Sequence, residues 1–113
     1  MAKVIIVRSL FEEIRRKFKG ESHKVIDLIE SLENHPKKGK ILSSIGGIVI
    51  KEIKYKSFRF YFITDGYQLR CLSQKELTNL LIKFVRMSDK KEQQKTIEEI
   101  KRILIKIGPL AFD

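Results

Sequence analysis

Four side chains with the chemistry needed to act on a phosphate lie on segments that have the pattern of β-strands. Arg59 and Tyr61 alternate with phenylalanines in residues 58–64, Lys54 ends the preceding β-branched segment, and Arg86 ends a later one. A guanidinium binds a phosphate through two hydrogen bonds, a lysine transfers a proton, and a tyrosine ring stacks on a base. We take these four residues as the candidates for catalysis.

Lysines extend the positive charge well beyond these four positions. The chain of 113 residues carries 24 Lys and Arg against 14 Asp and Glu, a formal net charge of +10. Such a surplus on a small domain attracts polyanions, and cations beside an aromatic ring on one sheet face favour RNA. The alternative is an ordinary solvated sheet face. The candidate RNA-binding residues are Lys37, Lys38, Lys51, Lys56, Lys83, Lys90 and Lys91.

Residues for other kinds of chemistry are scarce. His23 and His35 lie in no cluster with metal-ligand spacing, so we expect neither a metal nor a cofactor. No P-loop, dinucleotide-binding glycine pattern or nucleophile elbow occurs. The single cysteine, Cys71, excludes an internal disulfide, and we expect it to pack within a strand in a reducing, cytoplasmic setting. No apolar run has the length of a membrane span or a secretory signal, so no membrane partner is expected.

The first third of the chain predicts a strand and two helices. Residues 4–7 are β-branched throughout, as in a strand buried on both faces. Ser9 and Glu12 have the spacing of a capping box, which begins a helix that ends at Gly20. Apolar residues at helical spacing predict a second helix over residues 22–34. Two short helices in succession indicate an αα-hairpin on one face of a sheet.

Strands are predicted next, over residues 48–54, 58–64, 67–72 and 80–86. Asp65-Gly66 is a hairpin-turn signal, and residues 73–78 fit either a loop or a helical turn. The period of two in residues 58–64 places three phenylalanines on one face and Arg59 with Tyr61 on the other. We expect the phenylalanines to face the helices and the opposite sheet surface to be open.

A closing helix completes the predicted α+β domain, which spans residues 1–113. Asp89 and Glu92 can cap its start, and Gly108-Pro109 closes it, with a tail that docks through Phe112. Its apolar stripe consists of Ile97, Ile100, Leu104 and Ile107. The order is β-α-α-β-β-β(-β)-α, with a twisted, antiparallel-rich sheet, the αα-hairpin on one face and the C-terminal helix.

In this order of elements the chain resembles the RelE/ParE toxin superfamily, in particular its HigB-like, phage-derived branch. The resemblance spans nearly the whole chain. Its local marks are the turn at residues 34–39, the pair Gly46-Gly47, the segment Phe58-Arg59-Phe60-Tyr61, and Lys83-Phe84-Val85-Arg86 before a basic stretch and an Ile-rich helix.

The resemblance implies a RelE-like fold and a toxin that cleaves mRNA at the ribosome, without metal, by attack of a ribose 2′-OH on the adjacent phosphate. Arg59 would bind the phosphate, Arg86 would supply a second cation, and Lys54 or Lys56 would transfer a proton. Tyr61 would stack on a base or donate a proton. The implied partners are mRNA and a cognate antitoxin. The alternatives are a non-catalytic relative that binds RNA, an antitoxin or gyrase, and a structural module of a virus or plasmid.

Overall fold

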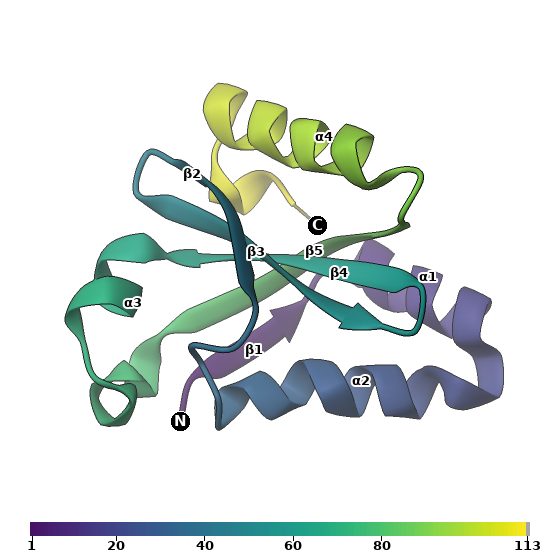
Figure 1. Ribbon diagram of the computed structural model, residues 1–113, viewed down its shortest axis with the longest axis horizontal. Helices are drawn as coiled ribbons and strands as arrows, with labels where there is room; N and C mark the ends of the chain where they lie inside the picture. The colour runs from purple at the N-terminus through teal and green to yellow at the C-terminus, as the bar shows by residue number, and fades with distance from the viewer. Residues whose placement is uncertain (113) are drawn as a thin grey trace.

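The computed structural model describes residues 1–112 and has an α+β fold built on a five-stranded mixed sheet (Figure 1). The strands are β1 (Lys3–Ile6), β2 (Lys40–Ile45), β3 (Ile48–Tyr55), β4 (Phe58–Asp65) and β5 (Leu81–Asp89). Their order across the sheet is β1-β5-β4-β3-β2, with β1 parallel to β5 and the other neighbours antiparallel. The predicted α+β class and the antiparallel-rich sheet are therefore confirmed.

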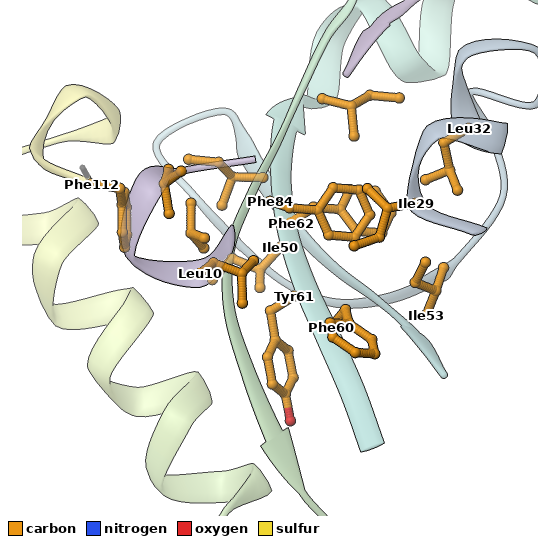
Figure 2. Packing of buried hydrophobic residues seen from close by; sticks show 14 of the residues in the cluster. Leu10, Ile29, Leu32, Ile50, Ile53, Phe60, Tyr61, Phe62, Phe84 and Phe112 are labelled. Carbon is orange, nitrogen blue, oxygen red and sulfur yellow. The ribbon is translucent and has the colours of Figure 1, made fainter. Parts of the chain in front are cut away.

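Helices α1 (Arg8–Phe18) and α2 (Ser22–Glu30) cover one face of the sheet, as predicted (Figure 1). Phe60 and Phe62 are fully buried on this face (Figure 2). The rings of Phe18 and Phe58 meet edge to face, with their centroids 5.3 Å apart. Short 3₁₀ turns at Lys19–Glu21 and Ser31–Glu33 follow the two helices. The buried helix residues are Leu10, Ile14, Val25, Ile29 and Leu32. The expected direction of the phenylalanines is confirmed.

Helix α4 (Gln93–Lys106) packs over the opposite face, which the sequence predicted to be open (Figure 1). Its buried residues are Ile97, Ile100 and Leu104, whereas Ile107 is exposed. The prediction of an open face is wrong because an apolar helical stripe must be buried, and the hairpin already fills the first face. Phe112 is buried, which confirms that the tail docks through it, whereas Asp113 lies outside the described residues. No helix within residues 1–112 is long and apolar enough to cross a membrane.

The predicted return strand at residues 67–72 is instead a helix, α3 (Gly66–Cys71). The Asp65 carboxylate accepts hydrogen bonds from the backbone N–H groups of Tyr67 and Gln68, so Asp65 caps a helix rather than starting a hairpin turn. A Cβ on Gly66 would lie 2.7 Å from Cγ2 of Val49, which explains why the tight approach of α3 to β3 needs glycine. Cys71 is exposed at the end of α3, so its predicted place inside a strand is also wrong.

Two further local predictions are wrong, and one open choice is decided. Strand β1 is an edge strand with alternating exposure and is not buried on both faces. Helix α1 begins at Arg8 with no side-chain cap at Val7, so Ser9 and Glu12 do not begin the helix as a capping box. A capping box does form at Ser73 and Glu76, where the ambiguous segment is a 3₁₀ helix, Gln74–Asn79. Strand β2 was not predicted.

We expect Gly39→Ala to destabilise the fold by about 1–3 kcal/mol. Gly39 has a φ of +107°, and a Cβ there would lie 2.8 Å from Cζ of the buried Phe62 ring. Gly20 is the matched control because a Cβ at that position meets no atom within 4 Å. Urea unfolding of both variants measures the effect. Equal midpoints for Gly39→Ala and Gly20→Ala would contradict the packing at Gly39.

Candidate active site

The sheet face beneath α4 gathers polar side chains from three adjacent strands. Across β3 and β4, Glu52 is paired with Tyr61, and across β4 and β5, Tyr61 is paired with Arg86 and Arg59 with Ser88. Directly paired residues in an antiparallel sheet point to the same side. We call these five residues, Glu52, Arg59, Tyr61, Arg86 and Ser88, the polar cluster. Three of the four predicted catalytic residues belong to it.

Glu52 and Arg59 form a buried ion pair at the centre of the polar cluster. Arg59 Nε lies 3.5 Å from Glu52 Oε2, and the side chains are only 12% and 2% exposed. Gln93 at the start of α4 donates from Nε2 to Glu52 Oε1 at 3.0 Å. Within the described residues, Arg59 Nε and Glu52 Oε2 have no hydrogen-bond partner. A buried carboxylate oxygen and guanidinium N–H without partners are costly, and such groups are common where a ligand is bound.

Tyr61 is fully buried, so the prediction that it faces an open surface is wrong. Its hydroxyl is hydrogen-bonded to Ser88 Oγ at 2.7 Å, and Ser88 Oγ lies 2.9 Å from the Asp89 carbonyl oxygen, to which it donates. Burial raises the pKa of Tyr61 above its ordinary value, and the hydrogen bond with Ser88 opposes this shift. In this position the neutral Tyr61 hydroxyl can hydrogen-bond to neighbouring groups, but the buried ring has no exposed face on which a base could stack.

Arg86 is held between α4 and the tail. Its Nε donates to Glu99 Oε1 at 2.6 Å and its Nη1 to the Val85 carbonyl oxygen at 2.7 Å, while the guanidinium lies 5.2 Å from the centre of the Phe112 ring. The side chain is 27% exposed. Arg86 is therefore the most accessible member of the cluster described so far, and Glu99 occupies the place where an anion would bind it.

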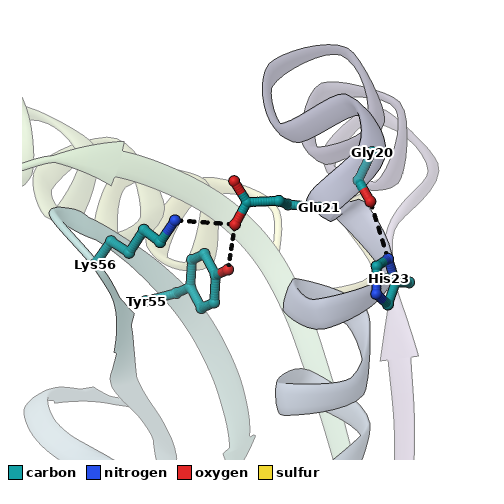
Figure 3. A network of polar contacts seen from close by, with 5 residues as sticks. All are labelled: Gly20, Glu21, His23, Tyr55 and Lys56. Atoms are coloured by element: carbon teal, nitrogen blue, oxygen red, sulfur yellow. Dashed lines mark hydrogen bonds and ion pairs between the residues drawn. The ribbon is translucent and has the colours of Figure 1, made fainter.

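The two lysines proposed for proton transfer lie in different places. Lys54 is exposed and paired with Arg59 across β3 and β4. Lys56 is in the turn after β3, and its Nζ lies 2.9 Å from Glu21 Oε1, which also accepts a hydrogen bond from the Tyr55 hydroxyl (Figure 3). This contact holds Lys56 near the α1–α2 connection, away from Arg59.

The predicted RNA-binding lysines are mostly exposed, with two exceptions. Lys37, Lys38, Lys56, Lys90 and Lys91 are exposed. Lys83 is half-buried and donates to the Pro109 carbonyl oxygen at 3.0 Å. Lys51 is 1% exposed and points to the hairpin side of the sheet, so its prediction as an RNA contact is wrong. Strand alternation explains this, because Lys51 and Phe62 are paired and point to the same side.

Lys51 illustrates the cost of a buried ammonium group. Its Nζ donates to the Lys37 carbonyl oxygen at 3.0 Å and lies 5.7 Å from the centre of the Phe62 ring. Burial lowers the pKa of Lys51 below its ordinary value of 10.5. The folded state therefore binds fewer protons than the unfolded state between the lowered pKa and 10.5.

We expect the stability of the wild type relative to Lys51→Met to rise with pH across that window. The favourable contribution of Lys51 to the free energy of unfolding is complete above pH 10.5. It is lost as the pH falls through the lowered pKa, because the unfolded chain binds a proton at Lys51 more readily than the folded chain does. Urea unfolding of both proteins at several alkaline pH values measures the difference in free energy of unfolding. A difference that stays constant across the window would contradict the burial of the ammonium group.

Sequence reasoning missed Glu52 and Ser88. The signal for Glu52 is a carboxylate inside a β-branched segment, on the same side of the strand as Lys54. Alternation within each strand does not give the register between strands, so it could not show that β4 and β5 bring Arg59 and Ser88 to the same side as Glu52. Among the described residues no group of three or more His, Cys, Asp or Glu side chains could hold a metal ion. His23 Nδ1 is hydrogen-bonded to the Gly20 carbonyl oxygen at 3.0 Å (Figure 3).

Comparison with protein-family models, characterised proteins and solved structures finds no significant match to this chain. The functional assignment therefore depends on the geometry of the polar cluster and on the positive charge around it.

Proposed function

We propose that the protein is a RelE-like toxin that cleaves mRNA without a metal ion. One observation carries the proposal: a carboxylate, two guanidinium groups and a phenol lie on one sheet face, in a protein of net charge +10. These are the groups needed to remove a proton, to bind a phosphate and to stabilise the charge that develops on it. The proposal also includes the RelE-like topology and a cognate antitoxin as a second partner.

The proposed reaction cuts RNA through its own 2′-hydroxyl. Glu52 accepts the proton of the 2′-OH, and the resulting oxygen bonds to phosphorus while the bond from phosphorus to the 5′ oxygen breaks. Arg59 and Arg86 bind the phosphate oxygens as negative charge accumulates. Lys54, exposed beside Arg59, gives a proton to the departing 5′ oxygen. The products are a 2′,3′-cyclic phosphate and a 5′-hydroxyl.

Access to the polar cluster requires the first half of α4 to move. Gln93 binds Glu52 and Glu99 binds Arg86, so both contacts from α4 occupy positions that the RNA would need. A phosphate of the RNA competes with Glu99 for the guanidinium of Arg86, and its negative charge also attracts the guanidinium of Arg59. We infer that RNA binding replaces these helix contacts, which would open the site only in the presence of a polyanion.

The test uses a single-stranded RNA and a version of the same oligonucleotide with 2′-deoxyribose at every position. We expect the purified protein to cleave the RNA in the presence of a chelator, to leave 2′,3′-cyclic phosphate ends, and to leave the deoxy version intact. Gel electrophoresis and mass spectrometry of the fragments measure this. The same assay is repeated with the RNA bound to ribosomes. Cleavage of both oligonucleotides would contradict attack by the 2′-hydroxyl, and cleavage of neither, free or on the ribosome, would contradict the nuclease.

A non-catalytic RNA-binding relative is the second candidate. The observation that favours it is the closure of the site: Tyr61 is fully buried, and both arginines of the polar cluster are paired with carboxylates. This candidate expects RNA to bind through the exposed lysines while α4 stays in place. Salt-sensitive binding of the RNA without cleavage would support it over the nuclease.

A further inference from the structure

A cleft lies away from the polar cluster, at the other end of the same sheet face. It has a volume of about 590 Å³ and is bounded by the Gly46-Gly47 turn, the start of α3 and the tail at Pro109 and Leu110. Figure 1 shows the β2–β3 turn and α3 at the end of the molecule away from the β3–β4 turn. Ile63 and Lys83, which are paired across β4 and β5, line the cleft from the sheet.

Apolar side chains at the cleft remain exposed to solvent. Leu110 is 91% exposed, and Leu81 is 45% exposed. The apolar surface continues onto β1, where Ile5 is 47% exposed and is paired with Lys83. Leu81 and Ile5 therefore point to the same side of the sheet as the lining residues. Exposed apolar residues that lie on the same side of neighbouring strands and beside a cleft indicate an interaction site, in contrast to single scattered apolar residues.

The charges around the cleft indicate which charge a partner must carry. Lys83 lines the cleft, and Lys3 is paired with Leu81 on the same side of the sheet. The one carboxylate in the lining, Asp65, already accepts hydrogen bonds from two N–H groups of α3. Because each copy of the chain carries a net charge of +10, two copies repel each other, whereas an acidic partner is attracted.

The backbone around the cleft indicates the secondary structure of the partner segment. Strand β5 is paired with β1 on one side and β4 on the other, so it has no free edge at Leu81 to which a partner strand could add. Addition of a partner strand to β5 is therefore excluded, which favours recognition through side chains, as when the apolar side of an amphipathic helix lies in a groove. We propose that this cleft binds an acidic, amphipathic helix of a partner protein. The inference stands without the proposed RNA cleavage.

A synthetic peptide tests the proposal without RNA. The probe is a fluorescein-labelled peptide of about five helical turns, with leucine at positions spaced three and four apart and glutamate elsewhere. The comparison peptide has the same composition in scrambled order. By fluorescence anisotropy we expect the amphipathic peptide to bind at least about tenfold more tightly than the scrambled one, because only the first presents one apolar side.

Two cleft variants and one control locate the binding. We expect Leu81→Ser and Leu110→Ser each to weaken binding of the amphipathic peptide about tenfold, whereas Ile105→Ser, exposed on α4 outside the cleft, leaves it unchanged. Both cleft residues are accessible, so the fold survives the changes, which circular dichroism checks. Equal binding of the two peptides, no binding, or no effect of either cleft variant would overturn the proposal. A dimer in sedimentation that Leu110→Ser disperses would overturn it in favour of a second copy.

Discussion

Replacing Arg59 with alanine is expected to reduce RNA cleavage by about a hundredfold or more and to destabilise the fold. The loss of rate follows because a positioned guanidinium no longer binds the phosphate as its charge grows. The loss of stability follows because Glu52, only 2% exposed at its side chain, is left without its ion-pair partner. Removing one partner of a buried ion pair costs about 3–5 kcal/mol. Single-turnover cleavage and urea unfolding measure the two effects.

The double variant Arg59→Ala with Glu52→Gln separates catalysis from folding. Neutralising the buried carboxylate removes the unpaired charge, so we expect the double variant to recover much of the stability that Arg59→Ala loses. Its cleavage rate should stay low. A double variant that is stable and cleaves RNA like the wild type would show that neither side chain acts on the substrate.

Glu52→Gln alone is expected to lower the rate of the chemical step by about a hundredfold to ten-thousandfold, because an amide cannot accept the proton of the 2′-hydroxyl. The amide oxygen can still accept the hydrogen bond that Gln93 Nε2 donates to Glu52 Oε1. RNA binding should therefore change much less than the rate. Single-turnover rates at saturating protein, together with the Kd for an uncleavable 2′-deoxy oligonucleotide, separate the two effects.

Glu98→Gln is the matched control for Glu52→Gln. Glu98 lies on α4 with a side chain that is 52% exposed, and it is paired with Lys101 at 3.6 Å rather than with the polar cluster. The same change of a carboxylate to an amide at this position should leave the rate near that of the wild type. If the two variants lose activity equally, charge on the protein surface explains the effect and Glu52 is not the proton acceptor.

Local patterns predicted the parts of the fold that depend on neighbours in sequence. The alternation around Arg59 correctly placed the phenylalanines toward the αα-hairpin, and the apolar stripe correctly predicted a helix near the end of the chain. The pair Asp65-Gly66 was misread because the same residues suit a hairpin turn and a helix cap. What decides between them is the tight contact of Gly66 with β3, which joins residues distant in the sequence.

The candidate site was predicted less completely than the fold. The period of two correctly grouped Arg59 with Tyr61, yet it could not show that Lys54 would be paired with Arg59 or that α4 would cover that side of the sheet. Burial of Tyr61 and the pairing of Arg59 with Glu52 depend on that helix and on the register of β3 with β4. Such features arise from tertiary packing, which periodicity within one strand does not contain.

The parallel pairing of β1 with β5 has a consequence for synthesis of the protein. Lys3 is paired with Leu81, and the polar cluster takes Arg86 and Ser88 from β5. Contacts between such distant positions make folding slow, because a long loop must close before they form. A chain emerging from the ribosome can form the αα-hairpin early, but its first strand must wait for β5. The nascent chain therefore has no complete polar cluster until β5 has emerged, and α4 follows at once to cover it.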